Sequence, residues 1–486
     1  MSRSNVLLVV MDSVRARNVG HLGHERDTTP FLDAFADGAT VHREARAPGR
    51  WSLPAHASLF TGHHVAEHRL FDEGRQLRPG NTVWADLSGR GYETGVFSYN
   101  GYINGATESG LERDFDTVEG YRDPPFPEAA NPQGIRGQHR EFLRRCVESG
   151  RPVRSALNGL LMKLAWDHPE RVPERLRRKT MAGETPDEVY IEEFLDWQQE
   201  REGPWAACLN LMITHNPFEP APEHDRWGTD RAHEIQDSLA FGNWEFLGGQ
   251  KPLDDLAALE VLYNGTIREA DAHVRRIVET LRERNDLEDT LVVVTGDHGE
   301  GFGGPDPVRP DLPTVQHVVG SHEHLLHVPL VVKYPGQTDR VDVDDPSSLT
   351  AFPRVARAVA DGEDVVPGET FVPDDGRVLA STHGLNEVNW ERMLEFCDGD
   401  TDRFDGETRV VYERDGDRTL KHLGWRDRAV TVVVEDPRTR RIVEGHGPAT
   451  VVADAFDDLT DASVIDAAGE GIDPETERRL EALGYR

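Results

Sequence analysis

The sequence predicts an α/β fold built around a mostly parallel sheet. Three apolar runs, 5–11, 205–213 and 290–295, have the length of buried strands, and each is followed by polar residues. Stretches with helical periodicity lie between these runs, and strands that alternate with helices usually pair in parallel. Ligands of such sheets bind where the strands reach their carboxyl ends. We therefore expect functional residues directly after the apolar runs.

The other elements follow in order along the chain. A helix is expected from Thr28, and residues 82–100 have the pattern of a helix, a glycine turn and a strand. The helix before the third apolar run is the clearest, because its apolar residues recur at i, i+3, i+4 and i+7. These residues are Val274, Ile277, Val278 and Leu281. Asn285 and Asp286 are expected to end this helix, and a further strand is predicted within 327–336.

We expect two parts in the chain. The first, 1–340, is predicted to be a catalytic domain, and the second, 341–486, a connector with a smaller C-terminal α+β subdomain. Residues from about 121 to 186 are polar, rich in arginine and proline and without strand signals, so we expect a helical insertion that caps the site. The C-terminal part is expected to hold alternating strands and a short final helix. These elements are predicted at 408–425, 428–436 and 473–486.

The chain carries a large excess of acidic residues. Its 486 residues include 88 Asp and Glu against 54 Lys and Arg, which gives a formal net charge of −34. An acidic surface that is poor in lysine is typical of a halophilic protein, because a salt-rich cytoplasm screens the self-repulsion. A merely acidic protein from a less salty cell is the alternative. Phosphate contacts need clustered cations, so nucleic acid is not expected as a partner.

Cysteine usage and hydropathy exclude two further classes of protein. The three cysteines show no paired spacing, so neither a disulfide framework nor a structural zinc site is predicted. No apolar run approaches the length of a membrane span, and the N-terminal run is too short for a secretory signal. We expect a cytoplasmic protein without a membrane span. The sequence does not indicate its oligomeric state.

Polar residues cluster at the predicted carboxyl ends of the strands. Asp12 follows the first apolar run, His215 the second, and Asp297 with His298 the third. Two carboxylates and one imidazole are a suitable ligand set for a divalent metal ion. Because the carboxyl ends of parallel strands meet at one edge, we expect these side chains to converge there.

Ser52 begins the stretch "SLPAHASLF" and opens a predicted helix, with His56 one turn later on the same face. A metal ion beside Ser52 would lower the pKa of its hydroxyl and make it a nucleophile. The plain alternative is a helix-starting serine, since serine followed by proline is common there. Likewise, an acid after a strand is often a turn residue, and His215 can be an ordinary loop histidine. The joint placement at the strand ends favours a site.

Seven segments occur in an order and spacing that one enzyme family shares. They are "NVLLVVMDSVRARNVGHLG", "TTPFLDAFADGATVHREARAPG", "SLPAHASLFTG", "ITHNPFEP", "TLVVVTGDHGEGFG", "GSHEHLLHVPLVV" and "LEALGYR". Together they resemble the sulfatase family of the alkaline phosphatase superfamily, and the third lies where sulfatases carry a C/S-x-P-x-R motif. The resemblance covers nearly the whole chain. It implies a sulfatase-like central sheet, mostly parallel and flanked by helices, with a smaller C-terminal α+β subdomain.

The resemblance also implies roles for single residues. The ligands of one divalent metal ion would be Asp12, Asp297 and His298. Ser52 would be the nucleophile, and His215 and His322 would contact the substrate oxyanion or the leaving group, although His317, His324 and His327 crowd the same stretch as His322. The oxygen ligands suit Ca²⁺, Mg²⁺ or Mn²⁺, and the imidazole shifts the preference slightly toward Mn²⁺ or Zn²⁺.

Three positions depart from the family pattern. Ser13 follows Asp12 where many sulfatases have a second acid, and His298 stands where many have asparagine. His56 replaces the arginine that, in the family, helps to hold formylglycine, an aldehyde made by oxidising the cysteine or serine. A formylglycine made from Ser52 therefore stays an open alternative to the unmodified hydroxyl.

Two chemistries and one non-catalytic role fit these residues. The first expectation is metal-dependent hydrolysis of sulfate esters, with attack from Ser52 on the ester sulfur. The same residue set also resembles lipoteichoic acid synthases and related phosphotransferases, which implies a phosphodiesterase or phosphotransferase with an unmodified serine. The third alternative is an inactive sulfatase-like protein that only binds an anion. In the catalytic cases the substrate would be a small-molecule or glycan sulfate or phosphate ester.

Overall fold

The structure is a computed structural model, and it describes 3–120, 126, 129, 146–147, 149–167, 186–239, 242–399, 401–437 and 440–466. Its centre is an eight-stranded sheet with the strand order β12-β2-β11-β8-β1-β7-β5-β6. The strands are β1 Asn5–Met11, β2 Thr40–His42, β5 Glu93–Ser98, β6 Thr117–Glu119, β7 Trp205–Leu211, β8 Thr290–Thr295, β11 Leu330–Lys333 and β12 Val341–Val343. All neighbours pair in parallel except β11, which runs antiparallel to β8 and β2. The expected mostly parallel α/β sheet is confirmed.

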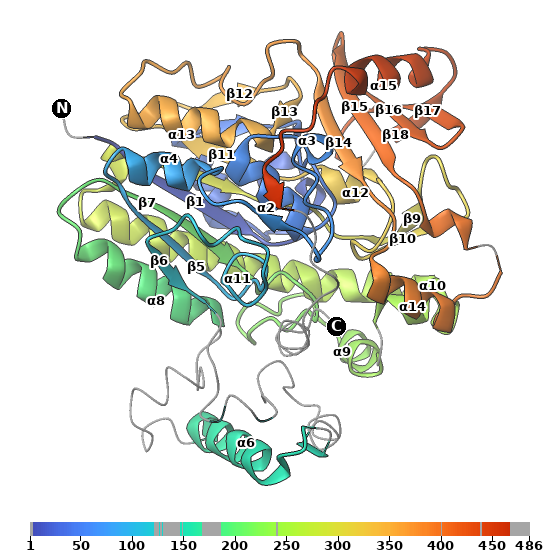
Figure 1. Ribbon diagram of the computed structural model, residues 1–486, viewed down its shortest axis with the longest axis horizontal. Helices are drawn as coiled ribbons and strands as arrows, with labels where there is room; N and C mark the ends of the chain where they lie inside the picture. The colour runs from blue at the N-terminus through green and yellow to red at the C-terminus, as the bar shows by residue number, and fades with distance from the viewer. Residues whose placement is uncertain are drawn as a thin grey trace.

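Helices cover both faces of this sheet (Figure 1). One face packs on α1 Pro30–Phe35, α8 Pro186–Gln199 and α11 Leu256–Glu283, and the other on α2 Ser52–Thr61, α4 Val83–Gly89 and α13 Phe352–Ala360. Successive residues of β1 alternate between the two cores, because side chains along a strand point to opposite faces. The continuous apolar run of the first strand therefore reflects burial on both sides.

The described residues also form further helices and three small sheets outside the large sheet. The helices are α3 Val65–His68, α6 Pro152–Asp167, α9 Asp230–Asp237, α10 Asn243–Leu247, α12 Glu323–Leu326, α14 Glu387–Phe396 and α15 Pro448–Asp457. Three two-stranded sheets pair β3 Ala45–Arg46 with β13 Ser347–Ser348, β4 Gln76–Leu77 with β19 Ile465–Asp466, and β9 Phe302–Pro305 with β10 Pro313–Val315. None of the helices in these described ranges is both long and apolar enough to cross a membrane.

Two local sequence patterns are confirmed. The periodic apolar residues 274–281 lie buried within α11, and that helix gives way to Asn285 in a left-handed conformation with φ 63°. Helix α4 is followed by Gly91, whose φ of 83° favours glycine, and then by β5. Much of the expected insertion at 121–186, and the expected final helix at 473–486, lie outside the described residues. The helix α6 falls inside that insertion, and the capping role stays a prediction.

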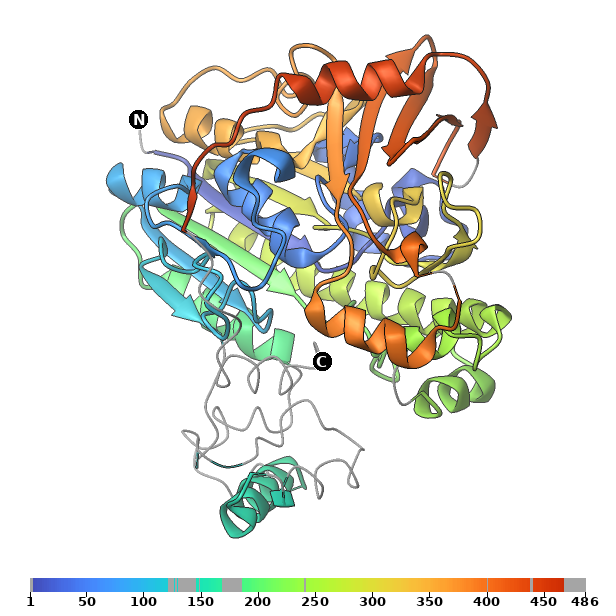
Figure 2. The same cartoon turned by 45° about the vertical axis from the view of Figure 1, so that its right-hand side comes forward.

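The C-terminal part forms an antiparallel sheet of its own (Figures 1 and 2). Its strands are β14 Val378–Thr382, β15 Thr408–Asp415, β16 Arg418–Trp425, β17 Arg428–Val434 and β18 Arg440–Val443. One face packs on α15, and the other packs on Leu325 and Leu326 of α12. The domain boundary near residue 340 stays a prediction, and β12 directly after it pairs with β2 of the large sheet.

Buried charges join the two sheets. The carboxylate of Glu323 on α12 forms an ion pair with Arg46 Nε at 2.8 Å, and it accepts hydrogen bonds from Lys421 Nζ at 2.9 Å and from the Tyr412 hydroxyl at 3.1 Å. These side chains are almost fully buried, and Lys421 and Tyr412 belong to the C-terminal sheet. Although burial raises the pKa of Glu323, the cations around it hold that pKa well below its usual value. The carboxylate is therefore ionised and binds α12 to the C-terminal sheet.

We expect the stability of the fold to decrease as the pH rises toward neutrality, and Asp271 on α11 is one cause. Its carboxyl accepts the backbone N–H groups of Phe31 and Leu32 at 2.8 Å each, and burial raises its pKa from 3.8 to about 7. The folded protein therefore holds a proton that the unfolded chain releases between pH 4 and pH 7, so stability is lost as the pH rises through 7. Asp271→Asn cannot ionise and should flatten this pH dependence by up to ~1.4 kcal/mol per pH unit.

Urea unfolding between pH 5 and pH 8 measures this effect. Asp37→Asn is the matched control, because it makes the same substitution on an 81% exposed side chain two residues after α1, the helix whose first turn Asp271 contacts. We expect Asp37→Asn to keep the pH dependence of the unmodified protein. An equal slope for Asp271→Asn and the unmodified protein would show that Asp271 is already ionised in the fold.

Candidate active site

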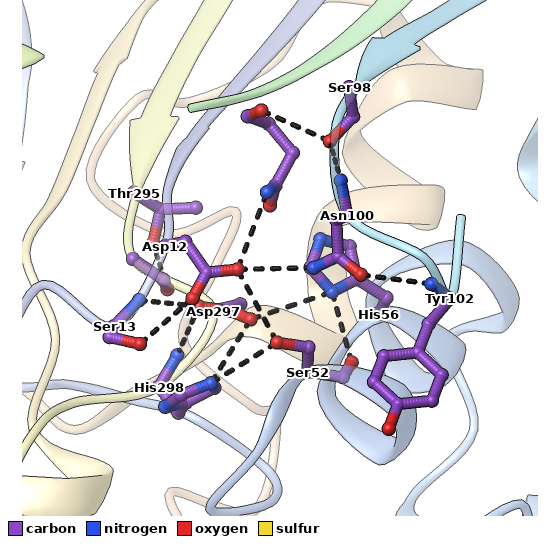
Figure 3. Close-up of polar contacts among 12 residues, drawn as sticks. Asp12, Ser13, Ser52, His56, Ser98, Asn100, Tyr102, Thr295, Asp297 and His298 are labelled. Atoms are coloured by element: carbon purple, nitrogen blue, oxygen red, sulfur yellow. Dashed lines mark hydrogen bonds and ion pairs between the residues drawn. The ribbon is translucent and has the colours of Figure 1, made fainter. Parts of the chain in front are cut away.

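The site lies at the carboxyl ends of four adjacent strands of the large sheet, β8, β1, β7 and β5. Asp297 follows β8, Asp12 follows β1, Asn210 lies at the end of β7, and Asn100 follows β5. The parallel register aligns these ends, since Val10 of β1 pairs with both Thr295 of β8 and Asn210 of β7. Residues far apart in the sequence therefore meet in one buried cluster (Figure 3).

Asp12 is the centre of this cluster. Its Oδ2 accepts hydrogen bonds from the Ser52 hydroxyl at 3.3 Å and from the amides of Asn100 at 3.1 Å and Asn210 at 3.3 Å. Its Oδ1 accepts the Ser13 hydroxyl at 2.8 Å. Burial raises the pKa of Asp12, but nearby histidines and the Ser13 hydrogen bond outweigh it and lower that pKa overall. Asp12 is therefore held as a carboxylate, as a metal ligand must be.

Asp297 uses one carboxylate oxygen for backbone hydrogen bonds and leaves the other without a hydrogen bond from any described residue, although two histidine rings lie near it. Its Oδ1 accepts the backbone N–H groups of Ser13 at 3.0 Å and His298 at 2.9 Å. Ser13 adopts a left-handed φ of 59° at the turn that follows β1. Among the described residues, Asp297 Oδ2 has no hydrogen-bond partner although it is buried. A buried, unpaired carboxylate oxygen is a suitable place for a cation.

His298 presents its second ring nitrogen to the same place. Its Nδ1 donates to the carbonyl oxygen of Gly299 at 2.9 Å, so in the neutral ring Nε2 carries the lone pair. That Nε2 lies 3.3 Å from the Ser52 hydroxyl and 3.4 Å from Asp297 Oδ2. Burial lowers the pKa of His298, but the carboxylates of Asp297 and Asp12 raise it above its ordinary value. A bound cation would take the place of that proton.

Asp12, Asp297 and His298, called the metal group below, fit a divalent metal ion. One ligand atom from each lies within 4.8 Å of the others, and all three side chains are buried. Two hard oxygen ligands and one imidazole match the donors that Ca²⁺, Mg²⁺ or Mn²⁺ take in proteins. The structure thus brings together the three residues that the sequence suggested, and their ligand role stays a prediction.

Ser52 points into the cluster and does not cap its helix. It is the first residue of α2, and the cap position is occupied by Trp51 without a side-chain hydrogen bond. The Ser52 hydroxyl instead lies 3.3 Å from Asp12 Oδ2 and 3.3 Å from His298 Nε2. This geometry favours the nucleophile over the helix-start alternative.

His56 supports Ser52 from the next turn of α2. Its Nδ1 lies 3.0 Å from the carbonyl oxygen of Ser52 and 3.5 Å from Asp297 Oδ2. The ring is buried against Phe60. His56 therefore joins residue 52 to a metal-group carboxylate, which is a positioning contact at the place where the family has arginine.

The other two predicted histidines, His215 and His322, lie at different distances from the cluster. His215 is partly exposed, it helps to lower the pKa of Asp12, and its ring centroid lies 5.4 Å from that of His317 with the two rings tilted. His322 caps α12, and within the described residues no hydrogen bond or ion pair joins it to the metal group or Ser52. Both substrate roles stay predictions.

The sequence analysis did not single out three residues of this site. His317 lies between His298 and His215, with its ring 4.6 Å from that of His298. Burial and the two histidines hold the pKa of His317 well below its ordinary value, so its ring is neutral. Asn100 and Asn210 donate to Asp12, and their position at strand ends was the available signal.

Comparison with known proteins agrees with this geometry. A family model described as sulfatase matches 4–367, which is most of the chain. The chain belongs to the sulfatase family. It is 24% identical over 428 residues to the multifunctional alkaline phosphatase superfamily protein PehA of Trinickia caryophylli, with 78% of this chain and 77% of PehA covered. It is 22% identical over 377 residues to arylsulfatase K of Mus musculus, with 71% of this chain and 58% of that protein covered.

A solved structure of another hydrolase shares the fold. The phosphonate monoester hydrolase of Agrobacterium radiobacter superposes with a TM-score of 0.61 at 19% identity, with 94% of each chain covered. The sulfatase-like sheet with a C-terminal antiparallel sheet is thereby confirmed. Family and fold support a hydrolase of sulfate or phosphate esters, and they leave the specific ester open.

Proposed function

We propose that this sulfatase-family protein hydrolyses sulfate esters with one divalent metal ion, and that residue 52 attacks the ester sulfur. The observation that carries the proposal is the position of the Ser52 hydroxyl, 3.3 Å from both Asp12 Oδ2 and His298 Nε2 at the edge of the metal group. A hydroxyl in this position is better suited to act as a nucleophile than to play a structural role.

The chain's own residues supply positioning and proton transfer. The Ser52 hydroxyl donates to Asp12 Oδ2, which directs its proton away from the ester and its lone pair toward it. The bond from Ser52 Oγ to sulfur forms as the bond from sulfur to the leaving oxygen breaks, and the hydroxyl proton passes to Asp12 Oδ2. In its doubly protonated form His215 can give the leaving oxygen a proton from Nε2, while its Nδ1 donates to the Asn216 carbonyl oxygen at 2.8 Å and fixes the ring. Water then cleaves the sulfated residue 52 and releases inorganic sulfate. Metal bound at Asp12, Asp297 and His298 would neutralise the charge of the transferred group and lower the pKa of the hydroxyl.

A second candidate is phosphoester hydrolysis or transfer by the unmodified serine. Its support is the contact of His56 with the Ser52 carbonyl oxygen, because a histidine stands where the family has the arginine that holds formylglycine. In this case Ser52 Oγ attacks phosphorus in line and the leaving oxygen departs on the opposite side. An inactive anion-binding protein is the third alternative, and the intact Ser52, Asp12, Asp297 and His298 weigh against it.

Peptide mass spectrometry of residue 52, on protein from its native host, tests the first candidate against the second. A loss of about two mass units at Ser52 would identify formylglycine and support sulfate-ester hydrolysis. The companion measurement is kcat/KM for a sulfate and a phosphate ester that share one leaving group. Preference for the phosphate ester by an unmodified Ser52 would overturn the first candidate in favour of the second. Metal binding without turnover of either ester would support the third.

A further inference from the structure

Two histidine rings at the start of α12 carry buried N–H donors without acceptors. His322 Nδ1 accepts the backbone N–H of His324 at 3.1 Å, so the proton of the neutral ring lies on Nε2. Burial and the nearby cations Arg440 and Lys421 hold the pKa of His322 well below its ordinary value, so the ring is neutral. Its Nε2 is fully buried and has no hydrogen-bond partner among the described residues.

The neighbouring ring repeats the pattern. Arg17 Nη1 lies 3.4 Å from His324 Nε2, and a guanidinium can only donate, so His324 Nε2 accepts and its proton lies on Nδ1. That Nδ1 is buried and also lacks a partner in the described part of the chain. The centroids of the His322 and His324 rings are 4.2 Å apart. Buried donors are almost always paired in proteins, so two adjacent unpaired donors indicate a missing acceptor.

Arg440 of the C-terminal sheet faces the same place. A methyl group built on Gly304 of β9 would lie 3.3 Å from His322 Nε2 and 3.6 Å from Arg440 Nη2, so both nitrogens border the bare Cα of this glycine. Within the described ranges, Arg440 makes no hydrogen bond or ion pair. The α12 segment and β9 lie beside the C-terminal sheet in Figure 1.

The charges around His322, His324 and Arg440 favour an anion over a cation. Arg440, Lys421 and Arg15 all act on His322, and the one acid that does so, Glu323, is already shared by Arg46 and Lys421. Both ring nitrogens in question carry protons, so neither can ligate a metal ion. A local excess of positive charge is notable on a chain whose formal net charge is −34.

We propose that Arg440, His322 and His324 form a second anion-binding site, separate from the metal group, which takes the oxygen atoms of a sulfate, phosphate or carboxylate group. A guanidinium and two imidazole N–H groups offer such a group charge-assisted hydrogen bonds. The site joins the catalytic domain to the C-terminal sheet. Its anion is either a free ion or a second anionic group of the ester substrate.

Calorimetric titration with inorganic sulfate tests the site in the Asp297→Asn protein, where the metal group is disabled. We expect that protein to bind one sulfate ion, and Arg440→Gln in the same background to weaken the binding at least about tenfold. Arg441→Gln is the matched control, because Arg441 is the next residue, is 57% exposed and pairs with Glu435. It should bind as its parent does. Absence of sulfate binding in Asp297→Asn, or equal binding with and without Arg440, would overturn the proposal.

A second variant guards against misfolding. Arg440→Lys keeps the positive charge, so it should retain more sulfate binding than Arg440→Gln at an unchanged unfolding temperature. Equal weakening of sulfate binding by Arg440→Lys and Arg440→Gln, with a lowered unfolding temperature in both, would mean that Arg440 acts through the fold and would also overturn the proposal.

Kinetics of Arg440→Gln in the otherwise unmodified enzyme identify the source of the anion. A roughly tenfold loss of kcat/KM for an ester with a second anionic group, but not for its neutral counterpart, would assign the site to substrate. Equal kcat/KM values for both esters, alongside lost sulfate binding, would assign it to a free ion. The kinetic experiment rests on the proposed ester hydrolysis, whereas the sulfate titration does not. A failure of the proposed function can therefore be distinguished from a failure of the proposed anion site.

Discussion

Replacement of Ser52 by alanine is expected to reduce turnover by about four orders of magnitude or more while the protein keeps its fold and its metal. The Ser52 hydroxyl is the group placed 3.3 Å from Asp12 Oδ2 and His298 Nε2, and it makes no cap for α2, so its removal costs the helix little. The measurement is kcat on the best ester found, together with the metal content and the unfolding temperature.

Ser58→Ala is the matched control for this variant. Ser58 lies on the same helix and is equally buried, but its hydroxyl contacts His68 Nε2 at 3.0 Å, away from the metal group. Its loss should cost about 1 kcal/mol of stability and leave kcat unchanged. Turnover by Ser52→Ala at the rate of the parent protein would show that Ser52 is a structural residue and not the nucleophile.

Asp297→Asn is expected to abolish metal binding and turnover together. The amide oxygen can replace Oδ1 and still accept the N–H groups of Ser13 and His298, so the loop after β8 should keep its shape. The amide nitrogen replaces Oδ2, the buried oxygen without a partner in the described chain, and it cannot ligate a cation. The loss of affinity should exceed the roughly 10–100-fold cost of removing an outer-shell partner.

Metal content after dialysis and activity with added Ca²⁺, Mg²⁺ or Mn²⁺ measure this result. Asp271→Asn serves as the control, because it also turns a buried carboxylate into an amide but lies on α11 under α1. It should keep both metal and turnover. A metal-loaded, active Asp297→Asn protein would show that the ion, if one is used, binds elsewhere.

The sequence could predict the sheet and its functional edge because both depend on patterns of neighbouring residues. Burial on both faces makes β1, β7 and β8 continuous apolar runs, and Asp12, Asp297 and His298 stand immediately after two of them. The antiparallel direction of β11 was not predictable in this way, because an apolar run of four residues has the same composition in either direction.

Contacts that depend on the tertiary fold could not be read from the sequence. Asn100 and Asn210 donate to Asp12 only because β5, β7 and β1 are neighbours in register. His317 and His322 share one histidine-rich stretch, and only the fold separates them. His317 lies beside His298, whereas His322 faces Arg440 across Gly304.

The buried carboxylate of Glu323 limits how this chain can be truncated or recombined. Lys421 and Tyr412 reach it from the C-terminal sheet, and Arg46 reaches it from the catalytic core. A gene shortened before β14 would encode a core whose Glu323 loses two of these three partners, and breaking a buried pair costs about 3–5 kcal/mol. The C-terminal sheet therefore cannot be removed without destabilising the core. A C-terminal sheet exchanged from another protein would need residues equivalent to Lys421 and Tyr412. Substitutions in the other strands of this sheet are tolerated only if they leave these two contacts with Glu323 in place.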